Sequence, residues 1–143
     1  MSILAWNCRG VGNPRTVQDL LALIKAHNPK LVFLSETLQC ENRMRNLRWR
    51  LGLKNCIAVQ SNNRGDGLLL YYDESLDVHL HSFSNHYIDV SVGGLSDQPW
   101  QLTCVYGEPR VERRLEMWNR LRYIKGTVNE PWLVLGDFNE AAF

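Results

Sequence analysis

A carboxylate and an amide lie one residue apart near the end of this sequence, directly after a run of apolar residues. They are Asp137 and Asn139, in the segment Leu135-Gly136-Asp137-Phe138-Asn139. Side chains of these two kinds are suited to holding a water molecule against a phosphate. On its own the segment is equally compatible with a simple turn, because Asp and Asn both favour turns.

Three further polar residues occupy similar positions earlier in the chain. Asn7, Glu36 and Tyr106 each follow or close a stretch that predicts a strand. Taken singly, Glu36 fits a solvated strand end, Asn7 a turn and Tyr106 a half-buried aromatic. Together with Asp137 and Asn139 they are hard to explain by packing alone. Polar groups beyond strand ends gather at one edge of an α/β sheet, where ligands bind.

The elements that must position these residues follow from the apolar pattern. Strands are predicted over residues 3–6, 31–34, 56–59, 68–72, 78–83, 87–92, 100–106 and 132–135. The runs 31–34 and 132–135 are continuously apolar, which predicts strands buried on both faces. The runs 56–59 and 68–72, with turn-forming residues between them, predict a hairpin.

Three helices are predicted between these strands. Asn13 as N-cap and Pro14 at the first helical position begin one helix. It should end near Asn28, because a proline follows. The others cover 41–51 and 110–123. Helices thus alternate with single strands and with a group of several strands, which indicates a mixed α/β chain.

Glycine and asparagine mark the connections. Residues 61–67 predict a turn and residues 93–99 a loop. Gly126 is expected to cap the third helix, since glycine readily adopts the left-handed conformation found there.

Composition limits the possibilities further. The 143 residues fit one domain, 1–143. A net charge of +1 does not by itself predict nucleic-acid binding. Four widely spaced cysteines show no metal-ligand spacing and favour a reducing compartment: Cys8, Cys40, Cys56 and Cys104. No signal peptide precedes Asn7, and no apolar run approaches the roughly 20 residues that cross a membrane.

Four motifs occur in a familiar order: Trp6-Asn7-Cys8-Arg9-Gly10, Leu34-Ser35-Glu36-Thr37, Val105-Tyr106-Gly107 and Leu135-Gly136-Asp137-Phe138-Asn139. They resemble the successive motifs of the endonuclease/exonuclease/phosphatase superfamily, which has the DNase-I-like fold. The segment 6–15 most resembles the apurinic-type endonuclease of plant LINE (non-LTR) retrotransposons. The resemblance covers residues 2–143. It implies a truncated DNase-I-like α/β sandwich of two facing mixed sheets flanked by helices, with the second sheet incomplete.

The resemblance also implies roles for the five polar residues in Mg²⁺-dependent hydrolysis of DNA. Glu36 would bind Mg²⁺, with Asn7 beside it as ligand or hydrogen-bonding support. Asp137 would orient or deprotonate the attacking water, and Asn139 would hold that water or a phosphate oxygen. Tyr106 would donate to the phosphate or the leaving oxygen.

Basic residues are the candidates for contact with DNA. Arg9 and Arg15 lie near the expected site, so they are better candidates for contact with DNA than the two basic clusters. Two basic clusters in the ranges 43–54 and 110–125 fit solvated helix faces or contacts with the phosphate backbone. The family resemblance further implies a nuclear location.

This chain departs from the family pattern in one respect. Family members carry a Ser-Asp-His motif further along, and these 143 residues hold no counterpart. Surface or structural roles are expected for His27, His79, His81 and His86, with a fortuitous metal site at His79 and His81 as the alternative. Without the later strands, 132–135 would lack neighbours and an apolar sheet face would be open to self-association.

Three interpretations follow from the sequence. The chain is a Mg²⁺-dependent endonuclease impaired by truncation, or a catalytically inactive retrotransposon-derived fragment with weak metal or nucleic-acid binding. A phosphatase or RNA exonuclease of the same superfamily is the third, disfavoured by the segment 6–15. The absence of the Ser-Asp-His motif should lower the rate strongly, because losing one group that stabilises transition-state charge typically costs about two to three orders of magnitude.

Overall fold

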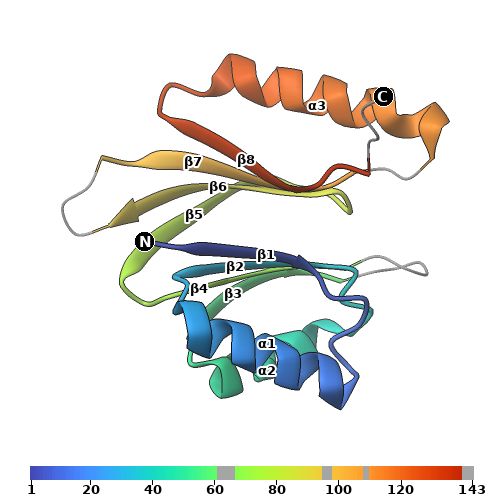
Figure 1. The fold of residues 1–143 in the computed structure, drawn as a ribbon. Helices are drawn as coiled ribbons and strands as arrows, with labels where there is room; N and C mark the ends of the chain where they lie inside the picture. Colours follow the sequence, from blue (N-terminus) through green and yellow to red (C-terminus); the bar gives the residue numbers. More distant parts are fainter. Residues whose placement is uncertain (61–66, 95–97, 108–109, 140–143) are drawn as a thin grey trace.

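A computed structural model of the chain describes residues 1–60, 67–94, 98–107 and 110–139. Two mixed four-stranded sheets face each other, and helices cover their outer faces (Figure 1). This is the α/β sandwich that the sequence predicts. Residues 61–66 of the predicted turn and 95–97 of the predicted loop lie outside the described residues. Gly93 and Gly94, predicted to begin that loop, instead end a strand.

The first sheet has the strand order β1-β2-β4-β3. Its strands are β1 (Ile3–Asn7), β2 (Leu31–Ser35), β3 (Asn55–Val59) and β4 (Leu68–Tyr72). β1 and β2 run parallel, as strands joined by a crossover helix do, whereas β4 is antiparallel to both its neighbours. The pairing of β3 with β4 is the one predicted for the hairpin.

Helices α1 (Pro14–His27) and α2 (Glu41–Leu51) cover the outer face of this sheet (Figure 1). The Asn13 side chain caps α1 by accepting a hydrogen bond from the Arg15 N–H at 2.9 Å. Asn28 ends the helix in a left-handed conformation with φ 44°. Both ends of α1 and the bounds of α2 are therefore as predicted.

The second sheet has the order β5-β6-β7-β8. Its strands are β5 (Leu76–Phe83), β6 (Tyr87–Gly94), β7 (Trp100–Tyr106) and β8 (Trp132–Asp137). The first three form an antiparallel meander, and β8 runs parallel to β7. Helix α3 (Arg114–Thr127) makes the crossover and covers the outer face.

The third helix differs in two respects from its prediction. Residues Val111–Arg113 form a single 3-10 turn, and α3 begins only at Arg114. Gly126 is not a cap, because the helix continues through it to Thr127. Val128 caps the helix in an extended conformation, and its N–H returns to a carbonyl three residues earlier. No left-handed glycine is needed at this end.

The central apolar layer lies between the two sheets. All five residues of β2 are buried, which confirms the prediction for that strand. Leu31 and Phe33 of β2 pack in one cluster with Ile88, Leu102 and other inward side chains of the second sheet. Each fully buried side chain of this size contributes about 1.5–3 kcal/mol to stability, so this layer holds the sheets together.

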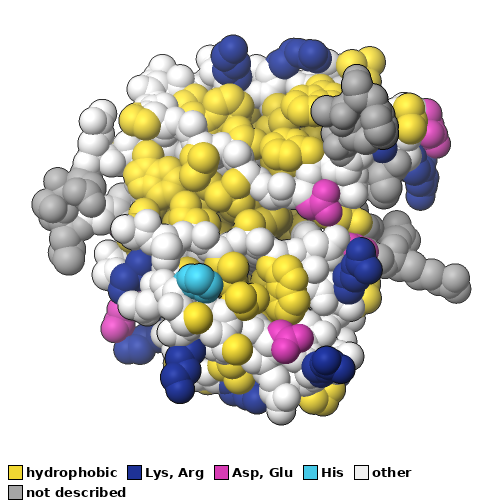
Figure 2. Space-filling view, viewed as in Figure 1, with side chains coloured by type: hydrophobic (Ala, Val, Ile, Leu, Met, Phe, Trp, Pro, Cys, Tyr) yellow, Lys and Arg dark blue, Asp and Glu magenta, His cyan; other side chains and the backbone are white. Residues whose placement is uncertain are grey.

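Strand β8 is less buried than predicted. It pairs with β7 from Trp132 to Asp137, so the expectation that it lacks neighbours is wrong on that side. Its other edge has no strand partner among the described residues. Leu133 is 41% exposed as a consequence. Figure 2 shows hydrophobic side chains gathered on the face that β8 borders.

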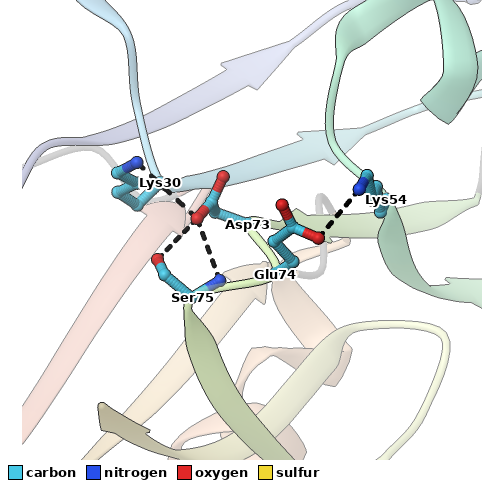
Figure 3. Close-up of polar contacts among 5 residues, drawn as sticks. All are labelled: Lys30, Lys54, Asp73, Glu74 and Ser75. Carbon is cyan, nitrogen blue, oxygen red and sulfur yellow. Dashed lines mark hydrogen bonds and ion pairs between the residues drawn. The ribbon is translucent and has the colours of Figure 1, made fainter. Parts of the chain in front are cut away.

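The chain passes from the first sheet to the second through a short turn after β4 (Figure 3). The Asp73 N–H donates to the Lys30 carbonyl at 2.9 Å, and the Ser75 N–H donates to the Asp73 carboxylate at 3.0 Å. The Ser75 hydroxyl bonds the same oxygen, and Lys30 Nζ lies 3.6 Å from it. An exposed ion pair between Lys54 and Glu74 adjoins the turn. Hydrogen bonds from Ser75, and then the charge of Lys30, lower the pKa of Asp73.

A buried polar cluster ties three strands of the second sheet together. Gln101 Nε2 donates to both carboxylate oxygens of Asp89 at 3.0 and 2.9 Å, and Thr103 Oγ1 donates to one of them at 2.8 Å. Trp132 Nε1 donates to the same Thr103 hydroxyl at 2.9 Å. These bonds offset the cost of burying the Asp89 carboxylate, which is 3% exposed. In the described part of the chain, no helix is long and apolar enough to span a membrane.

Candidate phosphodiesterase site

The ends of four strands bring the predicted residues to one edge of the sandwich. Asn7 is in register with Ser35, directly before Glu36, because β1 and β2 are parallel neighbours. Tyr106 is in register with Asp137 for the same reason in the other sheet. Parallel strands direct their carboxyl ends to a common edge, which is the usual place for a ligand.

Asn7 joins the two halves of this site. Its Nδ2 donates to Asp137 Oδ2 at 3.4 Å, a long hydrogen bond that crosses from one sheet to the other. Its Oδ1 is buried and has no hydrogen-bond partner among the described residues. A buried acceptor without a partner is rare and costly, so it marks a place where a ligand can bind. A small cavity of about 120 Å³ is lined by Asn7, Ser35, Gly136 and Asp137.

Glu36 follows β2 in a left-handed backbone conformation with φ 53°. Such a conformation costs a non-glycine residue roughly 1–3 kcal/mol and persists only where its surroundings enforce it. The loops after β1 and β2 enforce it through two hydrogen bonds, from Cys8 N–H to Ser35 O at 3.1 Å and from Val11 N–H to Thr37 O at 3.0 Å. The Glu36 carboxylate is half-buried and bonds no other described residue.

The Cys8 side chain links the loops that follow β1 and β2. Its thiol donates to the carbonyls of Ser35 and Glu36 at 3.4 and 3.8 Å. Burial raises the pKa of Cys8. The Cys8 thiol is therefore neutral, and it holds the backbone carbonyls of Ser35 and Glu36 as a hydrogen-bond donor.

Asp137 and Asn139 form a tight turn against β7. The Asn139 N–H donates to Asp137 Oδ1 at 2.9 Å, and Asn139 Nδ2 donates to the Gly107 carbonyl at 2.6 Å. The Gly107 N–H in turn donates to the Asp137 carbonyl at 2.6 Å. The amide nitrogen of Asn139 is thus engaged in structure, which leaves its Oδ1 to hold a water or a ligand.

Two glycines make this close approach possible. A Cβ on Gly136, where φ is 134°, would overlap the carbonyl oxygen of Val105. A Cβ on Gly107 would overlap the backbone of Phe138. In the sequence both glycines are neighbours of predicted site residues, Gly107 of Tyr106 and Gly136 of Asp137. That adjacency is the signal in the sequence that they shape the site.

Tyr106 is held by His86, a residue to which the sequence assigned a surface or structural role. The Tyr106 N–H donates to the His86 carbonyl at 2.8 Å, and His86 Nδ1 lies 3.0 Å from the Tyr106 carbonyl. The two rings are stacked, with centroids 6.5 Å apart and an interplanar angle of 8°. His86 therefore has a structural role, and this role is to position Tyr106 at the candidate site. Tyr106 is only 7% exposed.

The remaining predicted residues lie at the margin. Arg9 and Arg15 are exposed, one directly after β1 and one in the first turn of α1. In the described part of the chain, neither guanidinium forms a hydrogen bond or ion pair with the five site residues. His79 forms an exposed pair with Asp77 at 3.1 Å. Among the described residues no three His, Cys, Asp or Glu side chains group as a metal cage, so a metal site at His79 and His81 finds no support.

The donor set suits a hard cation that keeps several waters. Glu36 supplies a carboxylate that bonds no other described residue, and Asn7 supplies an amide oxygen that has no hydrogen-bond partner among the same residues. Mg²⁺ prefers such oxygen ligands and is usually bound by one or two carboxylates rather than a full protein cage. The residues present therefore fit a divalent cation of this kind.

Two facing mixed sheets with helices outside, and with polar side chains gathered at the carboxyl ends of parallel strand pairs, define this protein as a DNase-I-like α/β sandwich. The chain belongs to the Endonuclease/Exonuclease/phosphatase family, whose model matches residues 4–143.

Solved structures show the same fold. An AP endonuclease from Archaeoglobus fulgidus superimposes with a TM-score of 0.74 at 20% identity, over 97% of this chain and 57% of that one. Truncated TDP2 from Caenorhabditis elegans gives 0.69 at 15% identity, over 97% and 62%. TDP2 from D. rerio, complexed with a single-strand DNA product, gives 0.70 at 17% identity, over 98% and 61%.

This chain thus spans about three fifths of the length of these three structures. A comparison with curated proteins found no match.

Proposed function

We propose that this chain hydrolyses phosphodiester bonds of DNA with the help of Mg²⁺, at the edge where β1, β2, β7 and β8 end. The observation that supports this most is the buried Oδ1 of Asn7, which has no partner among the described residues, on a side chain that also bonds Asp137. The family membership supports the reaction class. An AP endonuclease and a TDP2 with bound DNA product among the similar structures support the substrate class.

Each side chain has a distinct part in this proposal. Glu36 and Asn7 hold Mg²⁺, which when bound offsets negative charge on the phosphate. Asp137 accepts a hydrogen bond from the attacking water and takes its proton. Asn139 Oδ1 holds the same water in line. Tyr106 donates its hydroxyl hydrogen to the phosphate or the leaving oxygen.

Outside the reacting atoms, Arg9 and Arg15 contact the DNA backbone. Contacts of this kind position the strand without reading its sequence.

We further propose that the chain is of LINE-retrotransposon type, on the resemblance of residues 6–15 to that branch. The Ser-Asp-His motif of the family has no counterpart in these 143 residues. We therefore propose that these residues alone are an impaired enzyme. An inactive fragment that only binds metal or DNA is the second candidate. The partly exposed apolar groove beside β8 supports self-association as a further proposal.

Nicking of supercoiled plasmid by the purified chain in Mg²⁺ tests the activity. The controls are EDTA, Asp137→Ala, and Asp77→Asn, which removes an exposed carboxylate on β5 far from the site. Nicking that EDTA and Asp137→Ala abolish but Asp77→Asn retains is the expected result. If folded wild-type protein nicks no faster than Asp137→Ala, the chain is the inactive fragment of the second candidate.

A further inference from the structure

A second polar cavity adjoins the candidate site on the side of the second sheet. It has a volume of about 270 Å³ and lies between α3 and the turn that joins β5 to β6. We call it the α3 pocket. Its polar lining residues are Ser84, His86, Arg113, Glu116 and Arg120.

The α3 pocket carries excess positive charge. Arg113 lies in the 3-10 turn directly before α3 and Arg120 lies within the helix, and both line this one cavity. Within the described part of the chain, neither guanidinium forms an ion pair with a carboxylate. Glu116 is the one acidic residue in the lining. Two planar guanidinium groups in one cavity suit a phosphate, which each can bind through two parallel hydrogen bonds.

Aromatic rings hold one of these arginines in place. The Arg120 guanidinium lies 6.0 Å from the centre of the Tyr87 ring and 5.6 Å from that of Tyr123. Contacts of this kind leave the N–H donors at the rim of the guanidinium available to a further ligand. Arg120 is thus orientated without its charge being neutralised.

The pocket is connected to the candidate site by His86. This residue lines the pocket and also stacks on Tyr106, whose carbonyl lies 3.0 Å from its Nδ1. The His86 N–H is fixed by Ser84 Oγ at 3.0 Å, and both residues belong to the pocket wall. The pocket therefore lies beside the residue that ends β7 at the candidate site.

We infer that the α3 pocket binds a backbone phosphate of a nucleic-acid strand, next to the phosphate at the candidate site. The identity of the ligand rests on the proposed function, whereas the pocket and its charge do not. Arg113 and Arg120 supply the direct contacts, and His86 keeps the pocket and Tyr106 at a constant separation. Since only the backbone is contacted, binding is independent of base sequence.

Binding of a fluorescent single-stranded oligonucleotide in EDTA tests this inference, with anisotropy recorded over a range of salt concentrations. EDTA prevents cleavage, so the result does not depend on activity. The variants are Arg113→Ala and Arg120→Ala. Arg122→Ala is the matched control, because Arg122 is exposed on the same helix but does not line the pocket. Circular dichroism confirms that each variant is folded.

Each pocket variant is expected to weaken binding roughly tenfold and to lower the salt dependence by about one counterion, while Arg122→Ala binds as the wild type does. Inorganic phosphate should shift amide resonances of the pocket, and only the oligonucleotide should also shift those of Tyr106 and Asp137. Equal affinities for all four proteins, or no binding by the wild type, would overturn the inference. A chain that binds in this way but never nicks plasmid would overturn the proposed activity alone.

Discussion

Asn7 is the residue on which the candidate site depends most. One end of it reaches Asp137 in the opposite sheet, and the other end is buried without a partner in the described structure. Buried polar atoms in proteins nearly always have a partner, and a bound water or ligand can supply the missing one here. The left-handed backbone at Glu36 fits the same interpretation, because strain of this kind gathers at functional sites.

At the same scale, Gly136 decides whether β8 can approach β7 at the site. We expect Gly136→Ala to lower the free energy of unfolding by more than about 2 kcal/mol, since its Cβ would overlap the Val105 carbonyl and its φ is 134°. Gly52→Ala is the control, because that glycine also has a positive φ but has open space around it. Urea denaturation measures both. Equal losses would show that the overlap at Gly136 is relieved without cost.

The elements of the fold were predictable from the sequence because their periodicity and caps are strong. Asn13-Pro14 and Asn28 delimit α1 as predicted, and the continuous apolar run of β2 is buried throughout. The predictions failed where tertiary contacts override local preference. Gly126 lies inside α3, and β8 is half exposed although its sequence is as apolar as that of β2.

The site was predictable in part for a related reason. Strand ends indicate which residues meet at an edge, so the five polar positions could be named. The stacking of His86 on Tyr106 joins residues 20 positions apart through strand pairing, and no local pattern encodes it. The α3 pocket likewise depends on where α3 packs against the second sheet.

The position of Gly126 leads to a stability prediction. Because this glycine lies within α3 and a Cβ there would meet nothing, Gly126→Ala should stabilise the protein by about 0.5–1 kcal/mol. Thermal unfolding should show a correspondingly higher Tm. Destabilisation would mean that Gly126 is a left-handed cap after all.

The turn between the sheets should make stability depend on pH through Asp73. Its pKa is lowered in the folded state, first by the hydrogen bonds from Ser75 and then by Lys30. The contribution is therefore fully present above the unfolded value of about 3.9 and is lost as the pH falls through the folded value. Asp73→Asn should cost up to about 1 kcal/mol at neutral pH.

Urea denaturation of wild type and Asp73→Asn, at about pH 7 and again below about pH 4, measures this contribution. The gap between the two proteins should shrink at the acid end. Glu74→Gln, which removes only the exposed pair with Lys54, serves as control. A gap that persists unchanged at acid pH would contradict the assignment.

On the scale of the whole molecule, β8 is an edge strand with no strand partner on its outer side among the described residues. The chain covers 57 to 62% of the three compared structures. Beside β8 lies an apolar groove of about 310 Å³, lined by Trp118, Leu121, Trp132, Val134 and Phe138, among other residues. A strand with one unpaired edge next to an apolar groove is a template for association.

We therefore expect the isolated chain to self-associate at micromolar concentration. Leu133→Lys places a charge on the edge strand β8, on the face opposite the groove. It should shift the protein towards the monomer, as judged by light scattering after size exclusion. Leu80→Lys is the matched control, because that leucine is similarly exposed, at 44%, on β5 at the far edge of the same sheet. A monomeric wild type, or an equal effect of both variants, would contradict the proposal.

The central claim is that Asn7 and Glu36 form one divalent-cation site beside Asp137. Titration of ¹⁵N-labelled protein with Mn²⁺, which shares the preference of Mg²⁺ for oxygen ligands, tests it most directly by paramagnetic line broadening. We predict that the amides around Asn7, Glu36 and Asp137 broaden first, that excess Mg²⁺ reverses the effect, and that folded Glu36→Gln loses it. Broadening elsewhere, or equal broadening in Glu36→Gln, would contradict the claim.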